Sequence, residues 1–153
     1  MAPSVADIVM DSDESDDELI DEEYQSFYEF LNSHFPIVNE VNLNLIETHI
    51  QTDHRYKNLV IDIMSEVKSD KLKVSVEIIM RTLIDDVLLK TYSYHNGRVE
   101  SIPKNFYELN LSDIVFESLI GQPQYENSFN EIEKEVKAYI LQAEQRYNQE
   151  NKK

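Results

Sequence analysis

The residue types best suited to metal binding or acid–base catalysis occur in 49-HIQTDH-54 and in the adjacent carboxylates Asp85 and Asp86. Five residues of helix turn through about 500°, and an odd separation on a strand reverses the face. His49 and His54 would therefore converge only in a loop. Acid–base catalysis needs one desolvated carboxylate, whereas adjacent acids on a polar face are usually both solvated. We therefore expect no catalytic residue, no metal and no other cofactor.

Other sequence motifs of enzymes are absent. The chain has no cysteine, which excludes disulfides, cysteine-based zinc sites and thiol catalysis. Its only glycines are Gly97 and Gly121, so it has no phosphate-binding loop, no dinucleotide fingerprint and no G-x-S-x-G elbow. The sequence predicts a protein that is not an enzyme, and an unrecognised active site is the third and least favoured hypothesis.

The negative charge of the chain is concentrated at its N-terminus. The formal net charge is −16, and residues 1–23 hold ten acids and no base, which leaves 20 acids and 14 bases elsewhere. Affinity for phosphates comes from clustered lysine and arginine, so we expect no direct nucleic-acid binding, whereas a basic protein partner is possible. No apolar run reaches about 18 residues, and the N-terminus lacks the features of a secretory signal. These features predict a location in the nucleus or, alternatively, in the cytoplasm, with no membrane contact.

One stretch of the leader, 7-DIVMDSDESDDE-18, joins three apolar residues to a block of acids and two serines. Solubility would explain the acids but not the apolar residues, because exposed apolar side chains in a disordered tail are mildly unfavourable. The arrangement resembles a SUMO-interacting motif. The resemblance implies that Ile8, Val9 and Met10 add a strand to a sheet edge of SUMO, while the acids meet nearby basic residues.

The residues that the resemblance assigns to protein binding are Ile8, Val9, Met10, Asp11, Asp13, Glu14, Asp16, Asp17 and Glu18. Ser12 and Ser15 lie in acidic surroundings of the kind that acidophilic kinases prefer, so both are predicted phosphorylation sites. Phosphorylation of either would add roughly −1.5 to −2 charges at pH 7. The predicted function is a non-enzymatic protein-binding subunit or adaptor of a nuclear multiprotein complex. The alternative is an acidic chaperone for a basic client such as a histone or a ribosomal protein.

A disordered acidic tail is predicted over residues 1–15, and a single α+β domain is predicted over residues 16–150. An N-terminal helix is predicted from apolar residues at helical spacing, and Pro36 should end it. The residues at this spacing are Ile20, Tyr24, Phe27 and Leu31.

The C-terminal third predicts two helices. Ser112 is the candidate N-cap of the first, which Gly121 should end. Ser128-x-x-Glu131 is a capping box that opens the second helix, which extends to Glu150. The predicted buried stripe of this last helix is Phe129, Ile132, Val136, Tyr139, Ile140, Ala143 and Tyr147.

The middle of the chain admits two interpretations. Apolar residues alternate with polar ones in 71-KLKVSVEIIM-80, in 41-VNLNL-45 and less cleanly in 59-LVIDIM-64, and Asn96-Gly97 suits a hairpin turn. The preferred fold class is therefore α+β, with an N-terminal helix, an antiparallel β-meander of four to five strands and two C-terminal helices. The alternative is an all-α helical bundle, since the same segments also fit helical faces. We favour strands because a helix over residues 71–80 would leave Val74 and Ile78 exposed.

Overall fold

The computed structural model describes residues 29, 33–67, 69–95, 97–99 and 102–151. The chain divides into two units, Met1–Phe35 and Pro36–Lys153, and each is described by itself. In the first unit, Ser33 and His34 are helical, and the helical geometry ends before Pro36 as predicted. The acidic leader and most of the predicted N-terminal helix lie outside the described residues.

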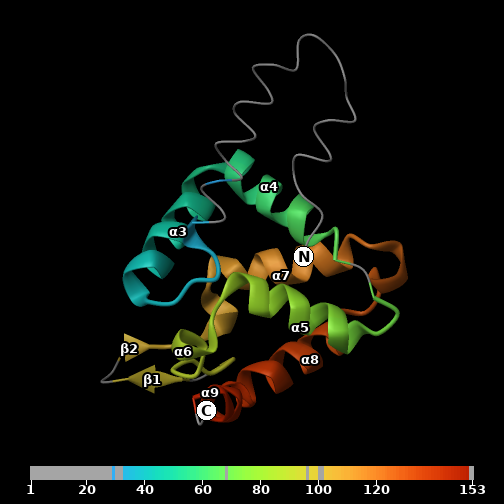
Figure 1. The fold of residues 1–153 in the computed structure, drawn as a ribbon. Coiled ribbons are helices and arrows are strands. Elements are labelled where there is room, and N and C mark those ends of the chain that lie inside the picture. The colour runs from blue at the N-terminus through green and yellow to red at the C-terminus, as the bar shows by residue number, and fades with distance from the viewer. Residues whose placement is uncertain (1–28, 30–32, 68, 96, 100–101, 152–153) are drawn as a thin grey trace. The chain divides into compact units, whose positions relative to one another are not determined.

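The second unit consists almost entirely of helices (Figure 1). The helices are α3 (Glu40–Thr52), α4 (His54–Met64), α5 (Leu72–Leu83), α6 (Asp86–Leu89), α7 (Asn110–Ile120), α8 (Phe129–Leu141) and α9 (Ala143–Glu150), with 3-10 turns η1 (Phe106–Glu108) and η2 (Pro123–Tyr125). The named strands within the described ranges are β1 (Arg98–Val99) and β2 (Ile102–Pro103), which pair antiparallel. The predicted β-meander was therefore wrong, and the all-α alternative fits. None of the helices described combines the length and the apolar character needed to cross a membrane.

Helix α7 lies at the centre of the second unit. Its buried residues are Leu111, Ser112, Ile114, Val115, Phe116, Ser118 and Leu119, which are most of the helix. Helices α3, α4, α5 and α8 all contact it, and Figure 1 shows it running between α4 and α5. A helix covered by neighbours on several sides is apolar on most of its surface, which explains the clear sequence signal for this element.

Helix α5 occupies the segment with the strongest alternating pattern. Its buried residues are Ser75, Val76, Ile79, Met80 and Leu83, and α7 and α8 contact this helix. Val76 and Met80 are four residues apart, so they fit one helical face as well as one strand face. As expected for a helix, two apolar side chains remain partly exposed to solvent. Val74 is 36% exposed and Ile78 is only half-buried. Burial of the remaining apolar side chains against two helices outweighs the cost of that exposure.

Helices α3 and α4 occupy the two other segments predicted as strands. Asn39 caps α3, since its side chain accepts a hydrogen bond from the Asn42 N–H at 2.8 Å. Asp53 ends α3 and caps α4 by accepting from the N–H groups of Arg55 and Tyr56. Asparagine and aspartate are preferred helix caps, and these two positions are the local signals that the alternating pattern obscured.

The hairpin of β1 and β2 does not have its turn at Asn96-Gly97. Val99 pairs with Ile102, so Gly97 precedes the hairpin, and Asn96 lies outside the described residues. A Cβ atom at Gly97 would lie 2.6 Å from the carbonyl oxygen of Lys104. Close approach of two backbone segments, rather than a tight turn, therefore requires glycine at this position.

The two C-terminal helices of the prediction are present with different ends. Helix α7 ends directly before Gly121, as predicted. Ser112 is buried inside α7 and does not cap it, because the N-cap residue is Leu109. Ser128 makes no side-chain capping bond, so the predicted capping box is not formed. The predicted last helix is divided at Gln142 into α8 and α9.

The predicted stripe of the last helix is largely buried. Its buried members are Ile132, Val136, Tyr139, Ile140 and Ala143. Tyr147 is half-buried. Phe129 remains 43% exposed and stacks on Phe116 of α7, with ring centroids 4.9 Å apart. Helical periodicity thus identified the inward face of this segment correctly.

Ser75 is a buried polar residue in the core-facing side of α5. It has no exposed surface, and its hydroxyl has no hydrogen-bond partner within the part of the chain described. Because an unsatisfied buried hydroxyl is unfavourable, Ser75→Ala should raise the free energy of unfolding in urea by about 1 kcal/mol. Ser118→Ala is the control, since the Ser118 hydroxyl donates to the Ile114 carbonyl at 2.6 Å and its loss should not stabilise. A lower stability of Ser75→Ala would contradict the prediction.

Candidate protein-binding site

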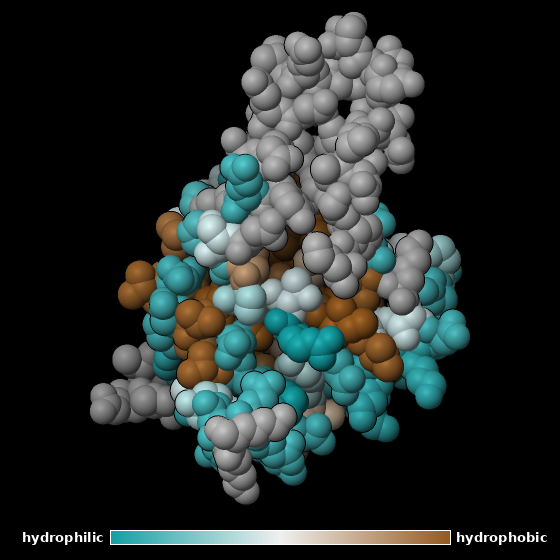
Figure 2. Space-filling view, viewed as in Figure 1, coloured by the Kyte–Doolittle hydropathy of each residue, from teal (hydrophilic) through white to brown (hydrophobic). Residues whose placement is uncertain are grey.

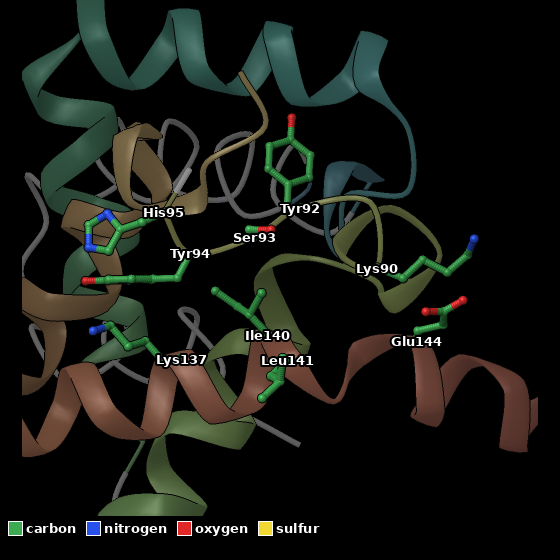
Figure 3. Close-up of a pocket in the computed structure, with 9 residues that line it drawn as sticks. All are labelled: Lys90, Tyr92, Ser93, Tyr94, His95, Lys137, Ile140, Leu141 and Glu144. Carbon is green, nitrogen blue, oxygen red and sulfur yellow. The ribbon is translucent and has the colours of Figure 1, made fainter. Parts of the chain in front are cut away.

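A hollow of about 370 Å³ opens between residues 90–95 and the facing turns of α8 and α9 (Figure 3). It is lined by Lys90, Tyr92, Ser93, Tyr94, His95, Lys137, Ile140, Leu141 and Glu144, and is termed the tyrosine pocket. One wall comes from residues 90–95 and the other from residues 137–144, so only the folded chain forms it.

Backbone pairing with the segment after the hairpin holds the first wall of the tyrosine pocket. The Ser93 N–H donates to the Lys104 carbonyl at 3.0 Å, and the Phe106 N–H donates to the Ser93 carbonyl at 2.7 Å. The Tyr107 N–H donates to the Tyr94 carbonyl at 3.1 Å. Phe106 is fully buried. The core therefore fixes the backbone of this wall through a buried aromatic anchor.

Tyr92 joins the same wall to α3. Its hydroxyl lies 3.2 Å from each carboxylate oxygen of Glu40, and Lys104 forms an ion pair with that carboxylate. Figure 3 shows the Tyr92 ring pointing away from α8. Burial, together with the negative charge of Glu40, raises the pKa of Tyr92 well above its ordinary value. The hydroxyl is therefore a neutral hydrogen-bond donor at physiological pH.

Tyr94 provides the aromatic surface of the pocket. Its hydroxyl donates to Glu133 at 2.8 Å, and its ring centroid lies 4.5 Å from that of His95 and 5.4 Å from that of Tyr107. Figure 3 shows His95 and Lys137 on opposite faces of the ring. Burial and the bond to Glu133 raise the pKa of Tyr94 well above its ordinary value. Tyr94 is thus a fixed, neutral platform rather than a proton acceptor.

Two lysines lie at opposite ends of the pocket in Figure 3. The Lys137 ammonium is 5.3 Å from the Tyr94 ring centroid, and the Lys90 ammonium is 4.8 Å from that of Tyr147. Among the residues that the structure describes, neither ammonium has a carboxylate oxygen within 4.0 Å. Each therefore keeps hydrogen-bond donors for an anionic ligand while its aromatic neighbour orients it.

An ion pair positions α9 at one end of the tyrosine pocket. Arg146 donates from Nε and Nη2 to the two carboxylate oxygens of Asp86 at 2.9 and 2.7 Å. The guanidinium also lies 3.5 Å from the Tyr139 ring centroid. Burial raises the pKa of Tyr139 to about 12, an effect that the positive charge of Arg146 partly offsets. The bidentate geometry joins α6, which precedes Lys90, to α9, which carries Glu144.

Two apolar side chains from α8 also line the pocket. Ile140 is buried, whereas its neighbour Leu141 is 85% exposed. Figure 3 shows both between the two lysines. Leu141 lies at the end of α8, where the chain changes direction at Gln142. This arrangement offers a ligand an apolar contact between two cations.

The tyrosine pocket presents cationic, aromatic and apolar side chains. Nucleophilic catalysis needs a hydroxyl within hydrogen-bond reach of a base, and no hydrogen bond joins Ser93 to His95, both of which the structure describes. Groups of three or more histidine, aspartate or glutamate side chains suited to a metal ion do not occur in the described part of the chain. The arrangement can hold an anion and an apolar group side by side.

The structure shows the positions of the residues considered for catalysis or metal binding, which are Asp85, Asp86, His49 and His54. Asp85 caps α6 by accepting the Val87 N–H at 2.9 Å, and Asp86 forms the ion pair with Arg146. His49 belongs to α3 and His54 begins α4, so the helix break at Asp53 separates them. The predicted protein-binding and phosphorylation residues, Ile8 to Glu18, lie outside the described residues.

Glu47 is a half-buried carboxylate that no sequence motif identified. It accepts the N–H groups of Asn110 and Leu111 at 2.7 and 2.9 Å, one with each oxygen. These groups begin α7, whose N-cap residue Leu109 makes no side-chain capping bond. Burial raises the pKa of Glu47, although the two backbone bonds lower it. A distant helix thus supplies the cap of the central helix, which explains why this carboxylate is desolvated.

Comparison with known proteins places the chain in no group. No protein-family model matches it, and no curated protein or solved structure is detectably similar to it.

Proposed function

We propose that this protein is a non-enzymatic protein-binding subunit or adaptor of a nuclear multiprotein complex, and that its acidic leader binds SUMO. The observation that carries the proposal is the sequence of residues 8–18, where three apolar residues precede six acids and two serines. Strand addition to a sheet edge supplies main-chain hydrogen bonds, and the acids add steering and register. Phosphorylation at Ser12 or Ser15 would strengthen the electrostatic part.

Exposed apolar side chains on the folded unit support a binding role. Val41 and Leu45 are four residues apart on α3 and Val38 lies just before this helix. All three are exposed, Val41 to 77%. Figure 2 shows hydrophobic side chains at the surface over α3, at the left of the view. Apolar side chains clustered at a surface are typical of contact with another protein.

The leader is tested by binding of the full chain to immobilised recombinant SUMO. Ile8→Ala/Val9→Ala should weaken binding at least about tenfold, because two apolar side chains that enter the groove are removed. The matched control is Val5→Ala, which removes a similar side chain from the leader outside the motif. Equal retention of the double variant and the unmodified chain would reject the SUMO interaction.

The alternative function is an acidic chaperone for a basic client, and the net charge of −16 favours it. Charge masking by the leader would make client binding depend steeply on salt, because exposed charges are screened over about 8–10 Å at physiological ionic strength. The probe is a purified histone dimer titrated with the full chain at low and high salt. Salt-insensitive binding of the histone would exclude charge masking, and tight salt-sensitive binding with no affinity for SUMO would favour the chaperone.

A further inference from the structure

We propose that the tyrosine pocket binds an acidic peptide segment of a partner protein, with one large apolar side chain placed between two carboxylates. The inference rests on the proposed role in protein binding and assigns a partner chemistry to a second site, separate from the leader. The carboxylates would contact Lys90 and Lys137, and the apolar side chain would pack on Ile140 and Leu141.

The charge of the pocket differs from that of the rest of the chain. Residues 24–153 hold 20 acids and 14 bases, which is a net charge of −6. The tyrosine pocket instead carries two lysines and one carboxylate, Glu144. The other nearby carboxylate, Glu133, accepts the Tyr94 hydroxyl at 2.8 Å. Glu133 keeps its negative charge in this bond, so the pocket has no excess of positive charge. What it offers an anionic partner is the ammonium groups of Lys90 and Lys137, which form no ion pair among the described residues.

The spacing of the two cations favours a peptide over a single small anion. Lys90 follows α6, Lys137 belongs to the middle of α8, and Figure 3 shows them at opposite ends of the row of lining residues. A lone phosphate needs donors that converge on one point. An extended segment instead spans separate cations and places alternate side chains in the hollow between them.

The apolar contact argues against a polyanion that binds through charge alone. Leu141 is almost fully exposed, and its buried neighbour Ile140 also lines the pocket. Nucleic-acid backbones require clustered basic residues, and the excess of acids in the body opposes that binding. A segment that combines acids with leucine, isoleucine or phenylalanine matches both features of the site.

The partner chemistry is tested by selecting a phage library of random ten-residue peptides against the full chain. Enriched peptides should hold at least two acids that flank a large apolar residue. For a synthetic enriched peptide, Lys90→Gln/Lys137→Gln should weaken binding about tenfold, as expected for two solvent-exposed ion pairs. Leu141→Ser should weaken it about fivefold through lost apolar contact.

Two matched controls separate the pocket from the rest of the surface. Lys71→Gln/Lys134→Gln makes the same change in net charge at exposed lysines that do not line the pocket, and Val41→Ser removes an apolar side chain exposed on α3. Both should bind the peptide within about twofold of the unmodified chain.

Three results would overturn the inference. The first is a selection that enriches no acidic peptide. The second is an equal loss of peptide affinity in the pocket lysine pair and in the control lysine pair. The third is complete displacement of the peptide by inorganic phosphate at constant ionic strength. Because the pocket variants leave the leader intact, retained SUMO binding without peptide selection would reject this inference alone. If acidic peptides are selected but the full chain does not bind SUMO, only the proposed binding of SUMO by the leader is rejected.

Discussion

Glu47→Ala should lower the free energy of unfolding by about 3 kcal/mol, the largest effect expected of any single polar side chain described. The carboxylate accepts the N–H groups of Asn110 and Leu111, which begin the central helix. Hydrogen bonds to a charged acceptor contribute about 1.5–3 kcal/mol each, and part of that gain is offset because the buried charge is also removed. Urea denaturation monitored by circular dichroism measures the change, and an unchanged slope would show that the unfolded state is unaffected.

Two further variants test the cap. Glu47→Gln keeps one acceptor oxygen of suitable geometry, so it should cost about 1–2 kcal/mol. Glu66→Ala removes an exposed glutamate at the end of α4 and should change stability by less than about 0.5 kcal/mol. If Glu47→Ala were as mild as Glu66→Ala, the cross-helix cap would make no contribution to stability.

The same carboxylate predicts a pH dependence. Burial raises the pKa of Glu47 in the folded chain above its ordinary value of 4.5. A raised pKa means that the folded state binds the proton more tightly, so this contribution is present at low pH and is lost as pH rises through the folded pKa. As pH falls from neutral toward 4.5, the stability of the unmodified chain should therefore rise relative to Glu47→Gln. A difference that stays constant, or moves in the opposite direction, would contradict the burial effect.

Gly97→Ala should lower the free energy of unfolding by about 2 kcal/mol, as expected for overpacking against a fixed backbone. The added Cβ would lie 2.6 Å from the Lys104 carbonyl oxygen and 2.9 Å from the Ser93 Cβ. Neither contact is relieved by rotating a side chain, because one partner is backbone and the other is a Cβ atom. Since Ser93 also pairs with Lys104 and Phe106, a shift here would disturb the wall of the tyrosine pocket.

Gly97→Asn separates the two explanations for this glycine. At a turn position of positive φ, asparagine is tolerated at small cost, whereas a close approach makes asparagine at least as unfavourable as alanine. Gly121→Ala is the control, because its Cβ would lie 3.1 Å from the Glu117 carbonyl oxygen at a residue of ordinary helical φ, and the cost should stay below about 1 kcal/mol. If Gly97→Asn were mild and Gly97→Ala severe, a turn with positive φ, and not the close approach of two segments, would explain the glycine.

The candidate site shows what sequence reasoning missed. Lys137 and Leu141 are ordinary members of an amphipathic helix, and Lys90 is an ordinary exposed lysine. Tyr92 and Tyr94 are two residues apart and would share one face of an extended segment. In the structure, Tyr92 bonds to Glu40 and Tyr94 to Glu133, on two different helices. Because the two side chains contact different helices, no spacing in the sequence indicates these contacts.

The middle of the chain was misassigned because its residues satisfy two periods. Val76 and Met80 fit both, and β-branched residues favoured the strand. The caps at Asn39 and Asp53 were local evidence for helices, yet they lacked the usual glutamate three residues later. The chain also has only two glycines, which are few for a domain with many tight turns. The helix caps and the low glycine content both favour the all-α fold, whereas only the alternation of apolar and polar residues favours strands.

The sequence by itself determined the inward face of the C-terminal helices, the end of α7 at Gly121 and the uneven distribution of charge. Each depends on neighbouring residues or on composition, which local geometry and solvation control. Tertiary structure alone decided that residues 71–83 are helical, that Glu47 caps a helix 63 residues away, and that two lysines flank an exposed leucine. Those outcomes depend on which surfaces pack together, because contact with α7 and α8 sets the free energy of each segment more strongly than its own propensity does.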